Sequence, residues 1–299
     1  MTSPLFESTQ DIANFERSIA TRALGKRIQF FNRTQSTNDL ALDAARGHGA
    51  HGTVFVADEQ DAGRGRRGRT WNCPPAMGLL FSVLVRPRTI PLEASGWIPL
   101  VAGLACAEAL ASFSEHLRGV TVKWPNDIVV PCDATPGWKK LGGILCESAL
   151  SAVSSDTTPV DLERGYAVIG IGLNINQTQA MLPETDKAPP TSLLLETGKC
   201  SDRQAVLQAI LERLEFHLDA LSDSSQRSAL RFAIEEKMRA WLPESKQITF
   251  RLPPFDVPNP NEQVGTFAGL DTFGRLRIRS VHDHIETAYA DAEIVAVQP

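Results

Sequence analysis

Apolar residues along the chain recur with two periods, one typical of helices and one typical of strands. Helical spacing predicts helices over residues 34–46, 97–117, 203–221 and 225–241. Runs of β-branched and apolar residues predict strands over residues 52–57, 79–85, 120–124, 127–130, 141–148 and 166–175. Because these elements do not alternate regularly, we expect an α+β fold with a central mixed β-sheet flanked by helices.

From Leu242 onward the helical period disappears. Short strands are predicted over residues 248–252, 265–270, 275–280 and 285–290, parted by turns such as 271–274. Short strands at this spacing are typical of a small β-barrel. We therefore divide the chain near Pro243 into a domain of residues 1–243 and a C-terminal small β-barrel domain of residues 244–299.

Composition is that of an ordinary soluble enzyme. The chain has 299 residues, of which 42% are hydrophobic and 22% are charged. Residues 1–22 include acids and no apolar core run, which is unlike a signal peptide. The most apolar helical stretch, residues 97–110, is too short to span a bilayer and includes Glu108. We expect a cytoplasmic protein that does not enter a membrane.

The cysteines and histidines show neither a disulfide framework nor a zinc site. The five cysteines are odd in number, and none is in a C-x-x-C pair. His282 and His284 flank Asp283, but no further ligand follows at a suitable spacing. We interpret this pair as part of an exposed turn.

The most unusual segment is rich in arginine and glycine. Arg64, Arg66, Arg67 and Arg69 alternate with glycines in residues 63–69, which we call the arginine loop. The chain as a whole has 30 Lys+Arg against 35 Asp+Glu, so this local positive charge needs a reason. Glycines let backbone N–H groups turn toward a ligand, and guanidinium groups bind phosphate or carboxylate oxygens in pairs. The segment therefore predicts a bound anion.

The arginine loop also matches the dinucleotide-binding pattern G-x-G-x-x-G, but its surroundings do not fit. That pattern requires a helix to begin inside it. Here Pro74 and Pro75 follow closely, and the next predicted element is a strand. The chain contains no Walker P-loop sequence either. We expect another geometry of anion binding.

A second cluster is Lys-Trp-Pro-Asn-Asp at residues 123–127. Pro125 interrupts a strand, so Asn126 and Asp127 either face a cleft or form an ordinary Asx turn. In a cleft, the carboxylate of Asp127 suits Mg²⁺ beside phosphates. The cluster alone does not decide between these alternatives.

Two glycine-containing strands complete the set of candidate motifs. Lys140 stands just before a strand with glycines at 142 and 143, and it is either a ligand contact or an ordinary surface charge. Gly170 and Gly172 weaken another strand, which often marks the close approach of a ligand. Asn174 and Asn176 follow on one face of that strand, by the two-residue period.

In combination, these motifs closely resemble those of the biotin–protein ligase family. They occur in order at residues 36–38, 60, 63–71, 123–127, 140–147 and 170–176. The resemblance covers residues 35–176 and continues more loosely through the C-terminal barrel. It implies that family's fold, which is similar to class II aminoacyl-tRNA synthetases, with an SH3-like C-terminal barrel.

The resemblance implies an ATP-dependent ligase. That family makes biotinyl-5′-AMP from biotin and ATP, releases pyrophosphate, and then passes biotin to one lysine of a carboxylase carrier domain. Both substrates of the first step are anions, so the protein must neutralise charge and align the reactants. By resemblance, Lys140, Arg66 and Arg69 are the expected catalytic residues, with Lys140 between the biotin carboxylate and the α-phosphate.

The resemblance also implies the substrate contacts. Ser36, Thr37 and Gln60 are expected at the ureido ring of biotin, the start of the arginine loop at its carboxylate, and Trp71 beside adenine. Asp127 is the expected Mg²⁺ ligand. The full expected set is Ser36, Thr37, Asn38, Gln60, Gly63, Arg64, Gly65, Arg66, Arg69, Trp71, Asn126, Asp127, Lys140, Gly143, Gly170, Gly172 and Asn174. Residues 131–139 form a longer loop than the family pattern suggests, so Lys139 is an alternative to Lys140.

The expected partner is the biotin carboxyl carrier domain of acetyl-CoA carboxylase, with other biotin-dependent carboxylases as further candidates. We expect no specific DNA binding, because too few residues precede Gln35 for a DNA-binding module. A homodimer is one candidate for the oligomeric state. A lipoate ligase or octanoyltransferase is the alternative enzyme, and the transferase would need a nucleophile, for which Cys146 or Cys73 is the candidate. An RNA-binding segment is the alternative non-enzymatic reading of the arginine loop.

Overall fold

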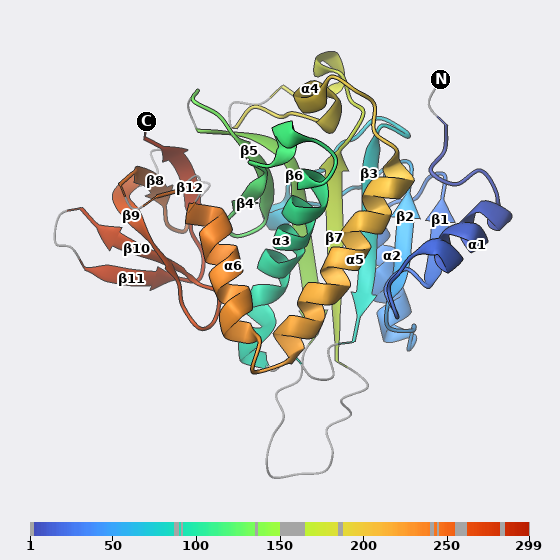
Figure 1. Cartoon of the computed structure of the whole chain (residues 1–299), viewed down its shortest axis with the longest axis horizontal. Helices are drawn as coiled ribbons and strands as arrows, with labels where there is room; N and C mark the ends of the chain where they lie inside the picture. Colours follow the sequence, from blue (N-terminus) through green and yellow to red (C-terminus); the bar gives the residue numbers. More distant parts are fainter. Residues whose placement is uncertain are drawn as a thin grey trace, which may run out of the picture.

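Two β-sheets with helices packed on them form the chain (Figure 1). This computed structural model describes residues 3–86, 90, 92–134, 137–149, 165–184, 188–239, 242–243, 245–254, 262–281 and 285–298. The predicted turn with His282 and His284 lies outside the described residues.

The larger sheet is mixed, as the sequence predicts. Its seven strands lie in the order β1-β2-β3-β7-β6-β5-β4. The β1–β2 pair is parallel, and the other neighbouring pairs are antiparallel. The strands are β1 (Arg27–Phe31), β2 (Thr53–Ala57), β3 (Gly78–Val85), β4 (Thr121–Lys123), β5 (Asp127–Pro131), β6 (Trp138–Ala149) and β7 (Tyr166–Asn174).

Helices cover the two faces of this sheet differently. The helices are α1 (Thr9–Ser18), α2 (Thr37–Arg46), α3 (Ile98–Ala111), α4 (Leu193–Thr197), α5 (Arg203–Ser222) and α6 (Arg227–Arg239). Helices α3 and α5 pack together over one face, whereas α2 packs on Phe55, Leu84 and Val168 of the other. Because side chains alternate along a strand, Gly170 and Gly172 share the face that carries α2.

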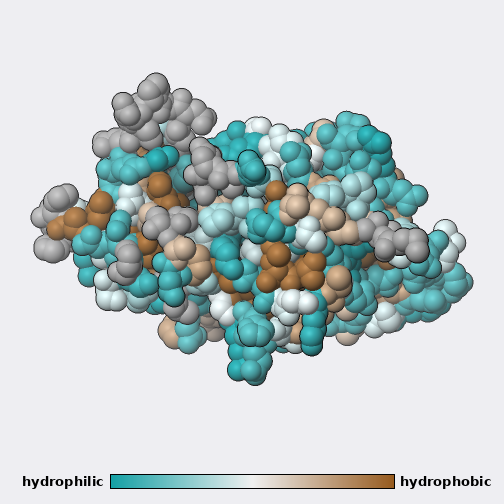
Figure 2. All heavy atoms as spheres, turned by 90° about the horizontal axis from the view of Figure 1, so that it is seen from above, coloured by the Kyte–Doolittle hydropathy of each residue, from teal (hydrophilic) through white to brown (hydrophobic). Residues whose placement is uncertain are grey.

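Helix α3 is the most apolar helix, and it is buried nearly all around. The segment 94–111 is long and apolar enough to cross a membrane by length and composition, but 72% of it is buried inside the fold. A helix that is apolar on every side is the mark of a core helix when protein surrounds it. The face in Figure 2 is mostly hydrophilic, with a few hydrophobic groups near its middle.

The smaller sheet follows α6 and is antiparallel throughout. Its order is β11-β10-β9-β8-β12, which is consistent with an SH3-like barrel. Its strands are β8 (Gln247–Arg251), β9 (Glu262–Leu270), β10 (Leu276–Ser280), β11 (Glu286–Tyr289) and β12 (Glu293–Val297). The indole N–H groups of Trp97 and Trp124 donate to the carbonyls of Thr272 and Gly274, at 2.9 and 3.0 Å. These bonds fix the smaller sheet against the larger one; the domain boundary near Pro243 stays a prediction.

Two predicted helices are too long. The helix predicted over residues 34–46 begins only at Thr37, and another extends too far at its C-terminal end. The prediction over residues 97–117 is wrong beyond Ala111, where α3 ends and Ser112 Oγ donates to the Ala109 carbonyl at 2.6 Å. A separate 3₁₀ turn, Glu115–Leu117, then buries Leu117. Leu117 continues the apolar spacing of the helix although the helix has ended, which explains why the sequence predicted one longer helix.

Candidate active site

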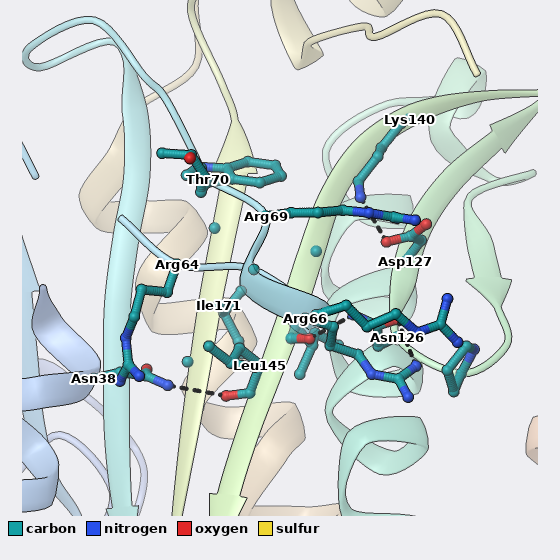
Figure 3. Close-up of a pocket in the computed structure, with 18 of the residues that line it drawn as sticks. Asn38, Arg64, Arg66, Arg69, Thr70, Asn126, Asp127, Lys140, Leu145 and Ile171 are labelled. Carbon is teal, nitrogen blue, oxygen red and sulfur yellow. Dashed lines mark hydrogen bonds and ion pairs between the residues drawn. The ribbon is translucent and has the colours of Figure 1, made fainter. Parts of the chain in front are cut away.

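The predicted site residues gather around one cavity on the α2 side of the larger sheet (Figure 3). The start of α2, the arginine loop, the β4–β5 turn, and strands β6 and β7 line it. All of the expected substrate-binding residues line this cavity except Gly63 and Asn174. The cavity measures about 140 Å³, and the side chains of the arginine loop reach into it. Ligand pockets usually enclose ~300–1,000 Å³, so we expect the loop to shift when substrates enter.

A polar network forms the wall nearest α2. Thr37 donates to Gln60 Oε1 from its backbone N–H at 2.7 Å, and Thr37 Oγ1 lies 2.8 Å from Ser82 Oγ. Ser82 Oγ donates to Asn38 Oδ1 at 2.5 Å. A Cβ at Gly170 would lie only 2.0 Å from Asn38 Oδ1, so this position has room only for glycine. The wall therefore offers fixed donors and acceptors to a small polar ligand.

A lysine–carboxylate cluster forms the opposite end. Lys140 Nζ donates to Asp127 Oδ1 at 2.7 Å, and Lys123 Nζ lies 3.9 Å from Asp127 Oδ2 (Figure 3). Burial opposes ionisation of Asp127, but attraction to Lys140 and Lys123 outweighs it and holds the pKa of Asp127 below its usual value. Burial also lowers the pKa of Lys123, although Asp127 partly offsets this. The cluster is thus a compact centre of positive charge that an anion can approach.

The strand geometry around Lys140 directs its side chain to this cluster. In the β5–β6 pairing, Ile128 faces Gly142 whereas Val129 faces Lys140, so one extra residue stands in β6. Such a bulge re-aims a side chain, and bulges are common beside active sites. The backbone of Lys140 is also fixed by hydrogen bonds to Pro189 and Thr191, both at 2.8 Å.

Lys139 points elsewhere. Its Nζ forms a close ion pair with Glu196 of α4. On either side of the segment that the sequence suggests as an insertion, β5 and β6 pair directly, and the Cys132 N–H donates to the Gly137 carbonyl at 3.1 Å. Between the two candidate lysines, only Lys140 reaches the cavity.

The arginine loop is a tight turn that depends on its glycines. Arg67 and Gly68 have φ of 59° and 70°, and the Gly65 N–H donates to the Arg69 carbonyl at 2.7 Å. Gly63 lies outside the cavity, and its carbonyl accepts from the Trp71 N–H at 2.8 Å. A Cβ at Gly63 would stand 2.3 Å from the Trp71 carbonyl oxygen. Gly63 thus supports the loop rather than lining the cavity.

Carboxylates hold the arginine side chains on both flanks of the loop. Arg64 contacts Asp39 at 2.6 Å and Glu147 at 2.9 Å. On the other flank, the smaller sheet supplies Asp291 and Glu293, which we call the C-terminal acidic pair. The pair contacts Arg66 (3.4 Å to Asp291), Arg67 (2.5 Å to Asp291) and Arg69 (3.1 Å to Glu293). The loop is therefore positively charged but locally neutralised.

Trp71 covers the glycines of the central strands. A Cβ at Gly172 would lie 2.8 Å from the indole ring, and Lys140 Nζ lies 5.7 Å from its centroid. The indole Nε1 is buried and has no hydrogen-bond partner among the residues that the structure describes. A buried donor without a partner is costly, so this N–H is available to a ligand.

Asn174 has a different place from the one expected. Its Nδ2 donates to the Thr191 carbonyl at 2.9 Å, and its Oδ1 accepts from Gln177 Nε2 at 3.0 Å. It is 5% exposed and stabilises the segment that follows β7. The glycines of β7 reach the cavity, whereas this asparagine does not line it.

Several residues of the site were not predicted. Lys123 begins the Lys-Trp-Pro-Asn-Asp motif. Its position four residues before Asp127 was the sequence feature that could have indicated its role. Ser82 lies in an otherwise apolar strand, which is a weak signal. Asp291 and Glu293 gave none, because they come from the far end of the chain and meet the loop only in the folded protein.

Comparisons with known proteins agree with this geometry. Residues 30–157 match the Biotin/lipoate A/B protein ligase family. A biotin–[acetyl-CoA-carboxylase] ligase of Mycobacterium tuberculosis is 31% identical over 268 residues, which cover 87% of this chain and 88% of that protein. The corresponding ligase of Paracoccus denitrificans is 31% identical, with 83% of this chain and 92% of that protein covered.

A solved structure is similar over nearly the whole chain. The biotin protein ligase from Aquifex aeolicus, in complex with biotin and ATP, has a TM-score of 0.67 and 28% identity. The match covers 90% of this chain and 99% of that one. Sequence, fold and site geometry agree, and the chain belongs to the biotin–protein ligase family.

Proposed function

We propose that the protein activates biotin with ATP to form biotinyl-5′-AMP and then transfers biotin to a lysine of a biotin carrier protein. The observation that carries the proposal is the composition of one cavity. A fixed polar wall at Thr37 and Gln60 lies at one end, and the Lys140–Asp127 cluster lies at the other. Biotin has a polar ring and a distant carboxylate, and the cavity offers partners for both.

In the first step, a biotin carboxylate oxygen attacks the α-phosphorus of ATP, and pyrophosphate leaves. Negative charge builds up on the α-phosphate oxygens as the new bond forms. Lys140 carries the charge that offsets this build-up, and Arg66 and Arg69 bind the phosphates after leaving the C-terminal acidic pair. No covalent bond to the protein is needed, so alignment and charge stabilisation provide the rate enhancement.

Trp71 and the glycine strands give the adenylate a surface to lie on. The indole of Trp71 packs directly over Gly172 and beside Gly143, and its unpartnered Nε1–H can donate to the ligand. When the arginine loop closes over the product, it excludes water from the mixed anhydride. The amine of the carrier lysine then attacks the biotinyl carbonyl carbon, and AMP leaves.

We propose that Mg²⁺ enters with ATP, with Asp127 as its protein ligand. Mg²⁺ in such sites is usually held by one or two carboxylates and by substrate phosphates. Among the described residues, no group of three or more His, Cys, Asp or Glu is arranged to hold a metal. Bound there, the ion would neutralise phosphate charge.

Acyl transfer through a cysteine is the weaker alternative. Burial raises the pKa of the Cys146 thiol to about 12 and that of Cys73 to about 11. Both thiols are therefore protonated at neutral pH, whereas the thiolate is the nucleophile. RNA binding is also disfavoured, because the arginine loop is short and single on a chain of net charge −5, whereas RNA-binding arginine–glycine tracts are long and repeated.

We further propose that the protein acts in the cytoplasm on the carrier domain of acetyl-CoA carboxylase. All five cysteines are free thiols, which suits a reducing compartment. The expectations of no specific DNA binding and of an available homodimer stay predictions.

The substrate is tested by offering the protein a choice. A purified biotin carrier domain is incubated with the protein, ATP, Mg²⁺ and either biotin or lipoate, and its mass is measured. We expect a mass increase of one biotin and no product with lipoate. A carrier lysine→arginine variant is the control. Modification by lipoate, or none by either acid, would contradict the proposal.

A further inference from the structure

We propose that Arg203 and Asp58 clamp the base of the segment that carries the arginine loop, and that both are positioning residues for the ligase reaction. The proposal rests on the function proposed above. Residues 59–77 connect β2 to β3 and include Gln60, the arginine loop and Trp71. Asp58 directly precedes this segment, and Gly78 directly follows it.

One guanidinium group joins both ends of the segment. Arg203 Nη1 donates to Asp58 Oδ1 at 2.6 Å and to the Gly78 carbonyl at 3.2 Å. The side chains of Arg203 and Asp58 are each 7% exposed, so water competes little for these bonds. Arg203 begins α5, whose N-terminal end lies beside β2 and β3 (Figure 1). The base of the loop segment is thus fixed to a core helix.

The N-terminal segment completes the clamp. Arg203 Nη2 donates to the Ser3 carbonyl at 2.7 Å, and the Leu5 N–H donates to Asp58 Oδ2 at 3.1 Å. Within the segment itself, the Ala76 N–H donates to the Asp58 carbonyl at 3.1 Å. Besides their ion pair, Arg203 therefore donates to backbone carbonyls and Asp58 accepts from a backbone N–H, and these backbone groups belong to different segments of the chain.

The position of this ion pair indicates a role beyond stability. Neither Arg203 nor Asp58 lines the substrate cavity, so both would act on the reaction through the segments that they hold in place, of which residues 59–77 reach the cavity. Gln60, two residues beyond Asp58, holds Thr37 in the polar wall at 2.7 Å. Buried ion pairs often add little net stability compared with apolar packing, but they fix geometry. A displacement of ~1 Å at a reacting site can cost about 10²-fold in rate, so a fixed base matters to the loop.

The test uses Arg203→Lys, which keeps the positive charge but removes the planar guanidinium group with its several N–H donors. One ammonium cannot reproduce the planar set of bonds to Asp58, Gly78 and Ser3. We expect the KM for biotin to rise at least tenfold in biotin-dependent pyrophosphate exchange. We also expect more AMP released per biotinylated carrier, severalfold above wild type, because a loosened loop exposes the intermediate to water. Asp58→Asn provides a second variant, in which we again expect a higher KM for biotin and more AMP released per biotinylated carrier.

His217→Gln is the matched control. His217 lies on the same helix, is 5% exposed, and contacts Glu108 at 2.9 Å, away from the loop segment. All variants are assayed well below their melting temperatures, so that lost stability alone does not change the result. If folded Arg203→Lys and Asp58→Asn keep the wild-type KM and AMP ratio, or if His217→Gln changes both as much, the clamp has no positioning role.

A ligand-free measurement separates this proposal from the proposed function. Trypsin cleavage within residues 63–69 should be severalfold faster in Arg203→Lys than in wild type and His217→Gln. Absence of pyrophosphate exchange in wild type would sink the proposed function. Equal loop cleavage in all three proteins would contradict the proposed clamp, independently of the ligase activity of the proteins.

Discussion

Lys140 owes its position to the strand around it. The extra residue in β6 turns Lys140 toward Asp127, whereas its neighbour Lys139 pairs with Glu196 of α4. Two adjacent lysines of the same chemistry thus have different surroundings, and the chain offers a natural comparison between them.

Lys140→Ala should therefore lower the rate of biotin adenylation by ~10²–10³, the usual cost of losing one donor to developing charge. Lys139→Ala should leave this rate within a few fold of wild type. Single-turnover formation of biotinyl-AMP measures the step directly. The reverse order of effects would transfer the catalytic role to Lys139.

Asp127 should make stability depend on pH in a defined direction. Its folded-state pKa is held below the ordinary 3.8, so its ion pair stabilises the fold above about pH 4 and is lost as the pH falls through the lowered pKa. Asp127→Asn leaves the buried Lys123 without this partner and should cost ~2 kcal/mol at pH 7, as for other hydrogen bonds between charged groups. Urea unfolding at pH 7 and pH 3 should show a smaller difference between variant and wild type at pH 3. A constant difference would contradict this account.

At the scale of elements, the arginine loop is the part of the site that we expect to move. Its glycines and mutually repelling arginines permit opening, and the C-terminal acidic pair restrains it. Biotin with ATP should close the loop and protect residues 63–69 from trypsin at least severalfold. Replacing the pair by Asp291→Asn with Glu293→Gln should speed cleavage in the absence of ligands. Equal cleavage with and without ligands in wild type would count against loop closure.

The elements that the sequence predicts well are those with a long, local pattern. The strands near residues 79–85 and 166–175 and the helix near 203–221 are continuous apolar or periodic runs, and they were found. Helices α1 and α4 and strands β1 and β12 were missed, because each is short and mixes buried with exposed positions. Their place depends on distant partners: β1 pairs with β2, and β12 pairs with β8.

Within the site, the sequence was most informative at positions where only one residue type fits the structure. Gly170 and Gly172 are required because a Cβ would meet Asn38 or Trp71, and such glycines are visible in a strand. Asn174 does not line the cavity, and the two-residue period could not show this, because it gives a face of the strand but not a distance from the cavity.

At the scale of the whole molecule, the smaller sheet is part of the site. Its strand β12 brings Glu293 to the rim of the cavity, and the Trp124 indole, in the β4–β5 turn, donates a hydrogen bond to the Gly274 carbonyl. The charge balance of the arginine loop therefore depends on residues from both ends of the chain. No local motif could reveal this, because the contact forms only after both sheets have folded.

The central claim is that cationic side chains in this cavity bring biotin and ATP together and allow them to react. It is tested most directly by the exchange of labelled pyrophosphate into ATP, measured with and without biotin and repeated with Lys140→Ala. The account predicts exchange that requires biotin and is ~10²–10³-fold weaker in the variant. Exchange that is independent of biotin, or absent from the wild-type protein, would contradict it.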